Sequence, residues 1–110
     1  MMEIAHREAA PGTYVVQLTG KLMLGPEGDQ ILQVVDECLA AGARRIVFDL
    51  SGVTVIDSTG IGRFIAAFNK IMALGGDMRM AGATGHVMQS FRVSLLDQVF
   101  TFYPSLEQAL

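Results

Sequence analysis

The sequence contains no tryptophan, only three prolines and a single cysteine, Cys38. A lone cysteine excludes an internal disulfide and fits a reducing compartment such as the cytoplasm. Charged residues make up only 17% of the chain, with 8 basic against 11 acidic side chains. The largest basic cluster is the pair Arg44–Arg45, which is too small a footprint for nucleic acid or an anionic membrane. We therefore expect no nucleic-acid partner.

Long apolar runs are also missing. The richest stretch, residues 61–74, is interrupted by Arg63, Asn69 and Lys70, whereas a membrane span needs about 18 apolar residues. Residues 1–8 lack the apolar region of a secretory signal, so we expect a cytoplasmic protein without direct membrane insertion. Hydrophobic residues still make up 51% of the 110 positions. This excludes intrinsic disorder and predicts one domain with a substantial core.

The common signatures of catalysis and cofactor binding are absent as well. His6 and His86 stand apart from any cluster with metal-ligand spacing, so no metal is expected. No phosphate-binding loop of the form G-x-x-x-x-G-K-[ST] occurs, and a dinucleotide fingerprint starting at Gly60 fails because its third glycine position holds Ile65. Neither histidine lies near Ser58 in the sequence to act as a base. We therefore expect a protein that is not an enzyme and needs no cofactor.

The chain does contain alternating short strands and helices. Strands are predicted at residues 3–8, 14–19, 45–50, 77–81 and 100–103. Helices are predicted from Gly25-Pro26-Glu27 to a stop at Gly42, after Asp57-Ser58-Thr59-Gly60 as far as Gly75-Gly76, and over residues 84–95, with a final helical turn at 105–110. Residues 51–56 are expected to form a loop or a short extension. The order predicts an α/β fold with a mixed, mostly parallel β-sheet, an N-terminal antiparallel hairpin and three to four α-helices, in a single domain spanning residues 1–110.

Apolar residues at helical spacing predict which side of each helix is buried. In the first helix these residues are Ile31, Val34, Val35, Cys38 and Leu39. In the second they are Ile61, Phe64, Ile65, Phe68, Ile71 and Met72. In the third they are Val87, Met88, Phe91 and Leu95. The outward face of the second helix then carries Thr59, Gly62, Arg63, Ala66, Asn69, Lys70 and Ala73, a mild surface suited to docking. Gly62 either permits close approach by a partner or is simply tolerated in a first turn.

The most informative stretch is Asp57-Ser58-Thr59-Gly60, at the start of the second helix. Three adjacent residues could each cap the helix, and a helix needs only one cap. The surplus leaves a hydroxyl displayed at a helix N-terminus, where N–H groups and the helix dipole stabilise negative charge. A phosphate on Ser58 would add about −1.5 to −2 charges to any surface packed there. The stretch therefore predicts a site that switches an interface.

Asp49, near the end of an apolar strand, offers a different interpretation. It occupies the position of the phospho-accepting Asp of a receiver domain, but residues 19–22 lack the acidic pair that would hold Mg²⁺. The plainer interpretation is a carboxylate hydrogen-bonded to the loop that follows it. A receiver-like phosphotransfer domain remains the less favoured alternative.

Residues 45–62, Arg-Ile-Val-Phe-Asp-Leu-Ser-Gly-Val-Thr-Val-Ile-Asp-Ser-Thr-Gly-Ile-Gly, resemble the strand, loop and helix start of STAS domains of the anti-sigma factor antagonist family. Residues 14–22 resemble the early strand and Gly-x-Leu turn of that family, and residues 76–82 resemble its next strand. The element order agrees over essentially the whole chain. The resemblance implies a STAS-like fold and a protein that binds other proteins and catalyses nothing itself.

The resemblance also implies a mechanism. Family members bind an anti-sigma factor that is a serine kinase of the histidine-kinase-like ATPase type, and binding releases the sigma factor. The kinase phosphorylates the motif serine, here Ser58, with Thr59 as the runner-up acceptor; binding then ends, and a serine phosphatase restores it. The residues implied in partner binding are Asp57, Ser58, Thr59, Gly60, Gly62, Arg63 and Met23.

The chain departs from the family at Met23, because family antagonists often have Asp directly after the Gly-x-Leu turn. An apolar residue cannot supply that charge. The departure raises two alternative roles, a subunit of a stressosome-type scaffold or the STAS subunit of a lipid-transport ATPase complex. In either role the chain would bind its partner constitutively. Met23 and Leu24 either contact a partner or pack on the first helix.

Overall fold

A computed structural model describes residues 2–25 and 29–110 of the chain. Within these residues the strands form one sheet of five, in the order β1-β2-β3-β4-β5. β1 (Met2–Ala10) and β2 (Thr13–Leu22) form an antiparallel hairpin. β3 (Arg45–Ile56), β4 (Asp77–Ala81) and β5 (Thr101–Tyr103) then follow in parallel. The predicted mixed, mostly parallel sheet with an N-terminal hairpin is confirmed.

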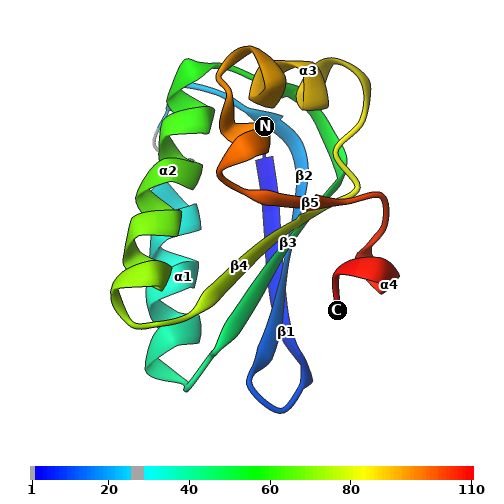
Figure 1. Cartoon of the computed structure of the whole chain (residues 1–110). Helices are drawn as coiled ribbons and strands as arrows, with labels where there is room; N and C mark the ends of the chain where they lie inside the picture. Colours follow the sequence, from blue (N-terminus) through cyan, green and yellow to red (C-terminus); the bar gives the residue numbers. More distant parts are fainter. Residues whose placement is uncertain (1, 26–28) are drawn as a thin grey trace.

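The helices are α1 (Asp29–Ala40), α2 (Ser58–Ala73), α3 (Gly85–Val93) and α4 (Leu106–Ala109), with a short 3₁₀ turn, η2 (Leu96–Gln98). Figure 1 shows α1 and α2 side by side along one face of the sheet, and α4 on the other side. Gly42 follows α1 in the left-handed region, as a helix stop should. The helix start predicted at Pro26-Glu27 lies outside the described residues. None of the helices in the described part of the chain is long and apolar enough to cross a membrane.

The main core lies between the sheet and the helices on its α1 and α2 face. Its centre is aromatic. The Phe64 ring of α2 packs edge-on against the rings of Phe48 of β3 and Phe91 of α3, with ring centroids 5.2 Å and 5.7 Å apart. All three rings are fully buried. Because α2 and α3 share this contact, the N-terminal region of α2 is fixed relative to both the sheet and α3.

Residues 51–56, expected to form a loop or a short extension, form an extension of the strand, because β3 continues through Ile56. Its second half pairs with the second half of β2, for example Gly52 with Thr19 and Ile56 with Leu22, after two register shifts at which β3 has one residue more than β2. Val53 and Ile56 are buried and hold this half in the sheet. The polar and glycine residues at the start of this half are the reason that the sequence did not decide between a loop and an extension. As a result, β2 and β3 end together just before α2.

Three side chains predicted to be buried are exposed instead. Ile65 and Met72 of α2 are 41% and 49% exposed, because the helix turns its small residues Gly60 and Ala67 toward the sheet. A helix can approach a sheet closely where small side chains face it, and this rotates Ile65 and Met72 outward. Leu95 is 62% exposed because α3 ends at Val93 and Leu95 adopts a left-handed conformation, with φ at 62°.

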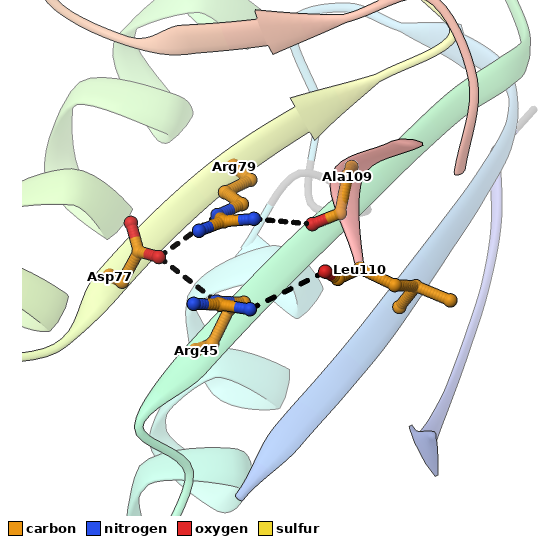
Figure 2. Close-up of polar contacts among 5 residues, drawn as sticks. All are labelled: Arg45, Asp77, Arg79, Ala109 and Leu110. Atoms are coloured by element: carbon orange, nitrogen blue, oxygen red, sulfur yellow. Dashed lines mark hydrogen bonds and ion pairs between the residues drawn. The ribbon is translucent and has the colours of Figure 1, made fainter. Parts of the chain in front are cut away.

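The opposite face of the sheet is partly covered by α4. Arg79 donates to Asp77 Oδ2 and to the backbone carbonyl of Ala109, both at 3.0 Å. Arg45 donates to the same Asp77 oxygen at 3.0 Å and to the Leu110 carbonyl at 3.5 Å. Figure 2 shows the two guanidinium groups between Asp77 and the end of the chain. They hold α4 over a small second core of four residues: Val15, Val47, Ala81 and Ala109.

Candidate functional site

Asp57 is the N-cap residue of α2 and the central hydrogen-bonding group of the site. Its Oδ1 accepts the N–H of Gly60 at 2.9 Å, which satisfies one of the free donors of the first helical turn. Its Oδ2 accepts the N–H of Leu24 at 2.9 Å, and its own N–H donates to the Leu22 carbonyl at 3.1 Å. Asp57 therefore ties the end of β2 to the start of α2.

These hydrogen bonds also set the charge of Asp57. The backbone N–H of Gly60, followed by that of Leu24, lowers the pKa of the Asp57 carboxyl below its ordinary value. The carboxylate form accepts both bonds, so it is favoured over the neutral acid. Asp57 is consequently a fixed negative charge beside Ser58.

Ser58 is the first residue of α2, and its side chain is exposed. Because Asp57 takes the capping role, the Ser58 hydroxyl makes no hydrogen bond within the described residues. The surplus hydroxyl inferred from the sequence is therefore present at this helix N-terminus. Thr59, the runner-up acceptor, is only half-exposed. Of the two hydroxyls, that of Ser58 is the more accessible to a modifying enzyme.

The two glycines of the motif have different structural roles. Gly60 is buried, and a Cβ at this position would collide with the backbone carbonyl oxygen of Leu22 and the side chain of Ile56. The end of β2 can therefore lie against α2 only if residue 60 lacks a side chain. Gly62 is exposed, and a Cβ there would meet nothing within 4 Å. Its open surface is compatible with both interpretations of Gly62 given above.

Arg63 does not extend freely from the outward face of α2. Its guanidinium pairs with Asp29 at the start of α1, with Nη2 and Oδ1 separated by 3.0 Å. The Arg63 side chain is 25% exposed. Part of its charge is thus neutralised within the domain, and the ion pair links the starts of α1 and α2.

Met23 and Leu24 form an exposed apolar pair beside the motif. Their exposed fractions are 45% and 79%, so neither side chain is buried against α1. The hydrogen bond from the Leu24 N–H to Asp57 holds this segment next to the start of α2. Of the two roles left open for this pair, contact with a partner agrees better with the exposure.

Ser58 also lines a groove that the sequence did not reveal. It has a volume of about 370 Å³ between α2 and α3. The residues lining it are Ile56, Asp57, Ser58, Ile61, His86, Gln89, Ser90, Val93 and Ser94. Val93 is 73% exposed and gives the α3 side an apolar rim. Only the topology could have indicated this groove, because parallel β-α units place successive helix N-termini at the same sheet edge.

His86 therefore lies closer to Ser58 in space than the sequence indicated. Both side chains line the groove, yet no hydrogen bond joins them within the described residues. A serine nucleophile needs a base within hydrogen-bond reach, so the pair as placed is not an activated nucleophile.

Asp49 lies away from this site, on the α4 face of the sheet. It is 7% exposed, and its Oδ1 accepts the N–H and the hydroxyl of Ser51 at 3.1 and 2.8 Å. The plainer interpretation of Asp49 is confirmed, although its partner belongs to a continuing strand. The β1-β2-β3-β4-β5 order also differs from the 2-1-3-4-5 order of receiver-type sheets. The receiver alternative is therefore not supported.

Comparison with known proteins agrees with this fold and motif. Residues 5–109 match the STAS domain family, and the chain belongs to that family. An anti-sigma factor antagonist from Mycobacterium paratuberculosis is similar at 22% identity, with coverage of 99% of this chain and 91% of that one and a TM-score of 0.82. The phosphorylated form of the Bacillus cell fate determinant SpoIIAA is similar at 17% identity, with 96% of each chain covered and a TM-score of 0.75. SpoIIAA, an anti-sigma factor antagonist, is also similar in its unphosphorylated form.

The same fold occurs in a different setting. A sulfate transporter family protein from Wolinella succinogenes is similar at 15% identity, with coverage of 94% of this chain and 86% of that one and a TM-score of 0.83. At these identities the solved structures establish a shared fold. The class is thus a STAS domain, and the choice among STAS functions depends on the residues around Ser58.

Proposed function

We propose that this chain is an anti-sigma factor antagonist switched by phosphorylation of Ser58. In the proposed cycle, the unphosphorylated chain binds an anti-sigma factor that is also a serine kinase with a histidine-kinase-like ATPase fold, and the sigma factor is released. The kinase then phosphorylates Ser58 and the complex dissociates. A serine phosphatase removes the phosphate and restores the form of the chain that binds. The observation that carries the proposal is the exposed Ser58 hydroxyl at the start of α2, left without an intramolecular hydrogen bond because Asp57 caps the helix.

A phosphate at this position would change the surface while leaving the fold intact. A helix N-terminus stabilises negative charge, so the modification is tolerated by α2 itself. The surroundings are less favourable for a partner that remains bound. Ser58 follows Asp57, which holds the segment of the exposed apolar pair Met23 and Leu24, and it lines the groove whose rim includes the exposed Val93. A partner covering this surface would have to desolvate a phosphate next to the ionised Asp57.

The remaining proposed contacts surround Ser58. Thr59 and Gly62 are on the accessible side of α2, and Gly62 leaves room for the backbone or side chain of a partner. The proposed roles of Asp57, Gly60 and Arg63 are indirect, because they fix the Leu24 segment, the sheet contact and the start of α1. SpoIIAA supports the proposal as a similar chain solved in both phosphorylated and unphosphorylated forms.

A second candidate is a STAS subunit with a constitutive partner, in a stressosome-type scaffold or a lipid-transport ATPase complex. It is favoured by the exposed apolar Met23, where antagonists often carry Asp, and by the likeness to a sulfate transporter family protein. In this case charge at position 58 would not alter binding, and Ser58 would have no regulatory role.

A quantitative pull-down from host lysate with ATP present separates the two candidates. The baits are wild type, Ser58→Ala and Ser58→Asp, with Gln108→Glu as a control that adds one negative charge on α4. The switch predicts that an ATPase of the kinase type is retained by Ser58→Ala and lost by Ser58→Asp, and that Gln108→Glu recovers as much of it as the wild type does. Equal recovery of the same transport or scaffold proteins by all four baits would contradict the switch and support the constitutive role.

A further inference from the structure

β1 is an edge strand with one side open. Among the described strands it pairs with β2 alone, and residues Met2 to Glu8 form a regular antiparallel ladder that ends in a register shift between Glu8 and Ala10. The outer side of such a strand presents unpaired backbone N–H and C=O groups, which form a template for another strand. Glu3, Ala5 and Arg7 are exposed along this edge.

Glu3 and Arg7 carry opposite charges that are not used inside the domain. Neither side chain makes an ion pair or a hydrogen bond within the described residues. Their cross-strand neighbours in β2 are Thr19 and Val15, which are uncharged. Four positions along a strand correspond to about 13 Å, so Glu3 and Arg7 cannot pair with each other. Both lie on the same face of the sheet, because side chains alternate along a strand.

This spacing is self-complementary. We propose that β1 pairs antiparallel with β1 of a second copy of this chain, in the register centred on Ala5, and forms a homodimer with one continuous sheet. In this register Glu3 of each copy lies directly opposite Arg7 of the other, which makes two cross-strand ion pairs. Opposite charges at directly opposed positions stabilise a pair of strands, whereas like charges destabilise it.

Neighbouring registers are worse. Moving the centre to Ile4 or His6 places Glu3 or Arg7 opposite Ala5. Moving it one position further places Glu3 opposite Glu3, or Arg7 opposite Arg7. In the register centred on Ala5, the numbers of two opposed residues differ by an even number. Residues whose backbone groups face outward in one copy therefore oppose outward-facing residues of the second copy, as the antiparallel hydrogen-bond pattern requires.

The geometry of the strand agrees with the same centre. Ala5 is the midpoint of the segment from Glu3 to Arg7, which lies within the regular part of the ladder before the register shift at Glu8. The two-fold axis would stand perpendicular to the sheet and keep α1 and α2 of both copies on one face. None of the residues lining the Ser58 groove belongs to β1, so this interface does not depend on the proposed function.

Sedimentation velocity over a range of protein concentrations tests the charge pattern. We expect reversible dimerisation of the wild type that is weakened at least tenfold by Glu3→Arg and by Arg7→Glu, and left unchanged by the control Glu107→Arg on α4. Mixing the two single variants restores association as a heterodimer, and Glu3→Arg combined with Arg7→Glu restores the homodimer. A monomeric wild type up to about 1 mM, the concentration at which a binding free energy of only about 4 kcal/mol is detected, would overturn the proposal.

Cross-linking tests the register without altering any charge. Ala5→Cys faces its own counterpart in the second copy, whereas Ala10→Cys residues would lie about 33 Å apart along the strands. A short bismaleimide should therefore cross-link Ala5→Cys and leave Ala10→Cys monomeric, while the native Cys38 is buried and protected. Circular dichroism checks that each variant is folded. Equal cross-linking of both variants, or no cross-linking of folded Ala5→Cys, would refute this register.

Discussion

The Asp57 carboxylate and the Leu24 backbone are joined by a hydrogen bond of 2.9 Å between positions 33 residues apart. The bond links the segment after β2 to the cap of α2. It therefore keeps the exposed Leu24 residue next to the start of α2, while the other carboxylate oxygen of Asp57 caps the helix and leaves the Ser58 hydroxyl free of a capping role. The surface on which the proposed switch depends is organised by a residue that is not itself modified.

Replacing Asp57 tests this organising role. We expect Asp57→Ala to lower the free energy of unfolding, because α2 loses its cap and the Leu24 N–H loses its acceptor. Asp57→Asn should lower the free energy of unfolding less than Asp57→Ala does, since asparagine is also a favoured N-cap. Urea denaturation measures the difference, and hydrogen exchange at the Leu24 amide reports the loss of the link directly. An unchanged exchange rate in Asp57→Ala would contradict the link.

The lowered pKa of Asp57 predicts a pH dependence with a definite sign. Because the pKa is lower in the folded than in the unfolded chain, ionised Asp57 stabilises the fold above its ordinary unfolded pKa of about 3.9. This contribution is lost as the pH falls through the folded pKa. The stability difference between wild type and Asp57→Asn should thus be constant near neutral pH and shrink in acid. A difference that grows in acid would have the wrong sign.

Gly60 and Gly62 form a matched pair for substitution by alanine. Gly60→Ala places a methyl group against the Leu22 backbone carbonyl, which cannot rotate away, so we expect destabilisation of about 1–3 kcal/mol. Gly62→Ala meets open space and should stabilise α2 by up to about 1 kcal/mol. Thermal and urea unfolding measure both effects. Loss of partner binding by a stabilised Gly62→Ala would show that a partner approaches closely there, and full binding would show that the glycine is merely tolerated.

Variants of Ser58 should change regulation with little effect on the fold. Ser58 is exposed and does not cap α2, so Ser58→Ala and Ser58→Asp should each unfold within about 0.5 kcal/mol of the wild type. A carboxylate at a helix N-terminus is well tolerated. Calorimetry or urea titration checks this expectation. A large loss of stability in Ser58→Ala would instead identify Ser58 as a structural residue.

Arg79 is predicted to hold α4 in place. Its guanidinium bonds Asp77 and the Ala109 carbonyl, and it lies 5.3 Å from the centre of the Tyr103 ring. Hydrogen bonds to charged groups contribute about 1.5–3 kcal/mol, so Arg79→Ala should release α4 measurably. The amides of residues 106–110 should then exchange faster, while those of α2 remain protected. Equal protection of α4 in both proteins would show that its apolar contacts suffice.

Much of this structure follows from local patterns. The strand at 77–81 and the α2 start after Asp57 were predicted from the sequence because alternation, apolar runs and capping residues are short-range signals. Ile65 and Leu95 were wrongly predicted to be buried. For Ile65, periodicity alone does not show which side of a helix approaches the sheet. For Leu95, it does not show that the helix ends early, at Val93. The groove beside Ser58 joins α2 to α3 across 25 or more positions, and only the folded chain brings them together.

Phosphosite mapping is the most direct test of the proposed switch. The chain is isolated from host cells, or incubated with the captured kinase-type ATPase and ATP, and its tryptic peptide from Ile46 to Arg63 is sequenced by mass spectrometry. This peptide contains Ser51, Thr54, Ser58 and Thr59. The expected result is one phosphate on Ser58, with binding to the ATPase lost in the modified fraction. A peptide that carries no phosphate while the ATPase is bound and active, or binding that persists after Ser58 is modified, would contradict the switch.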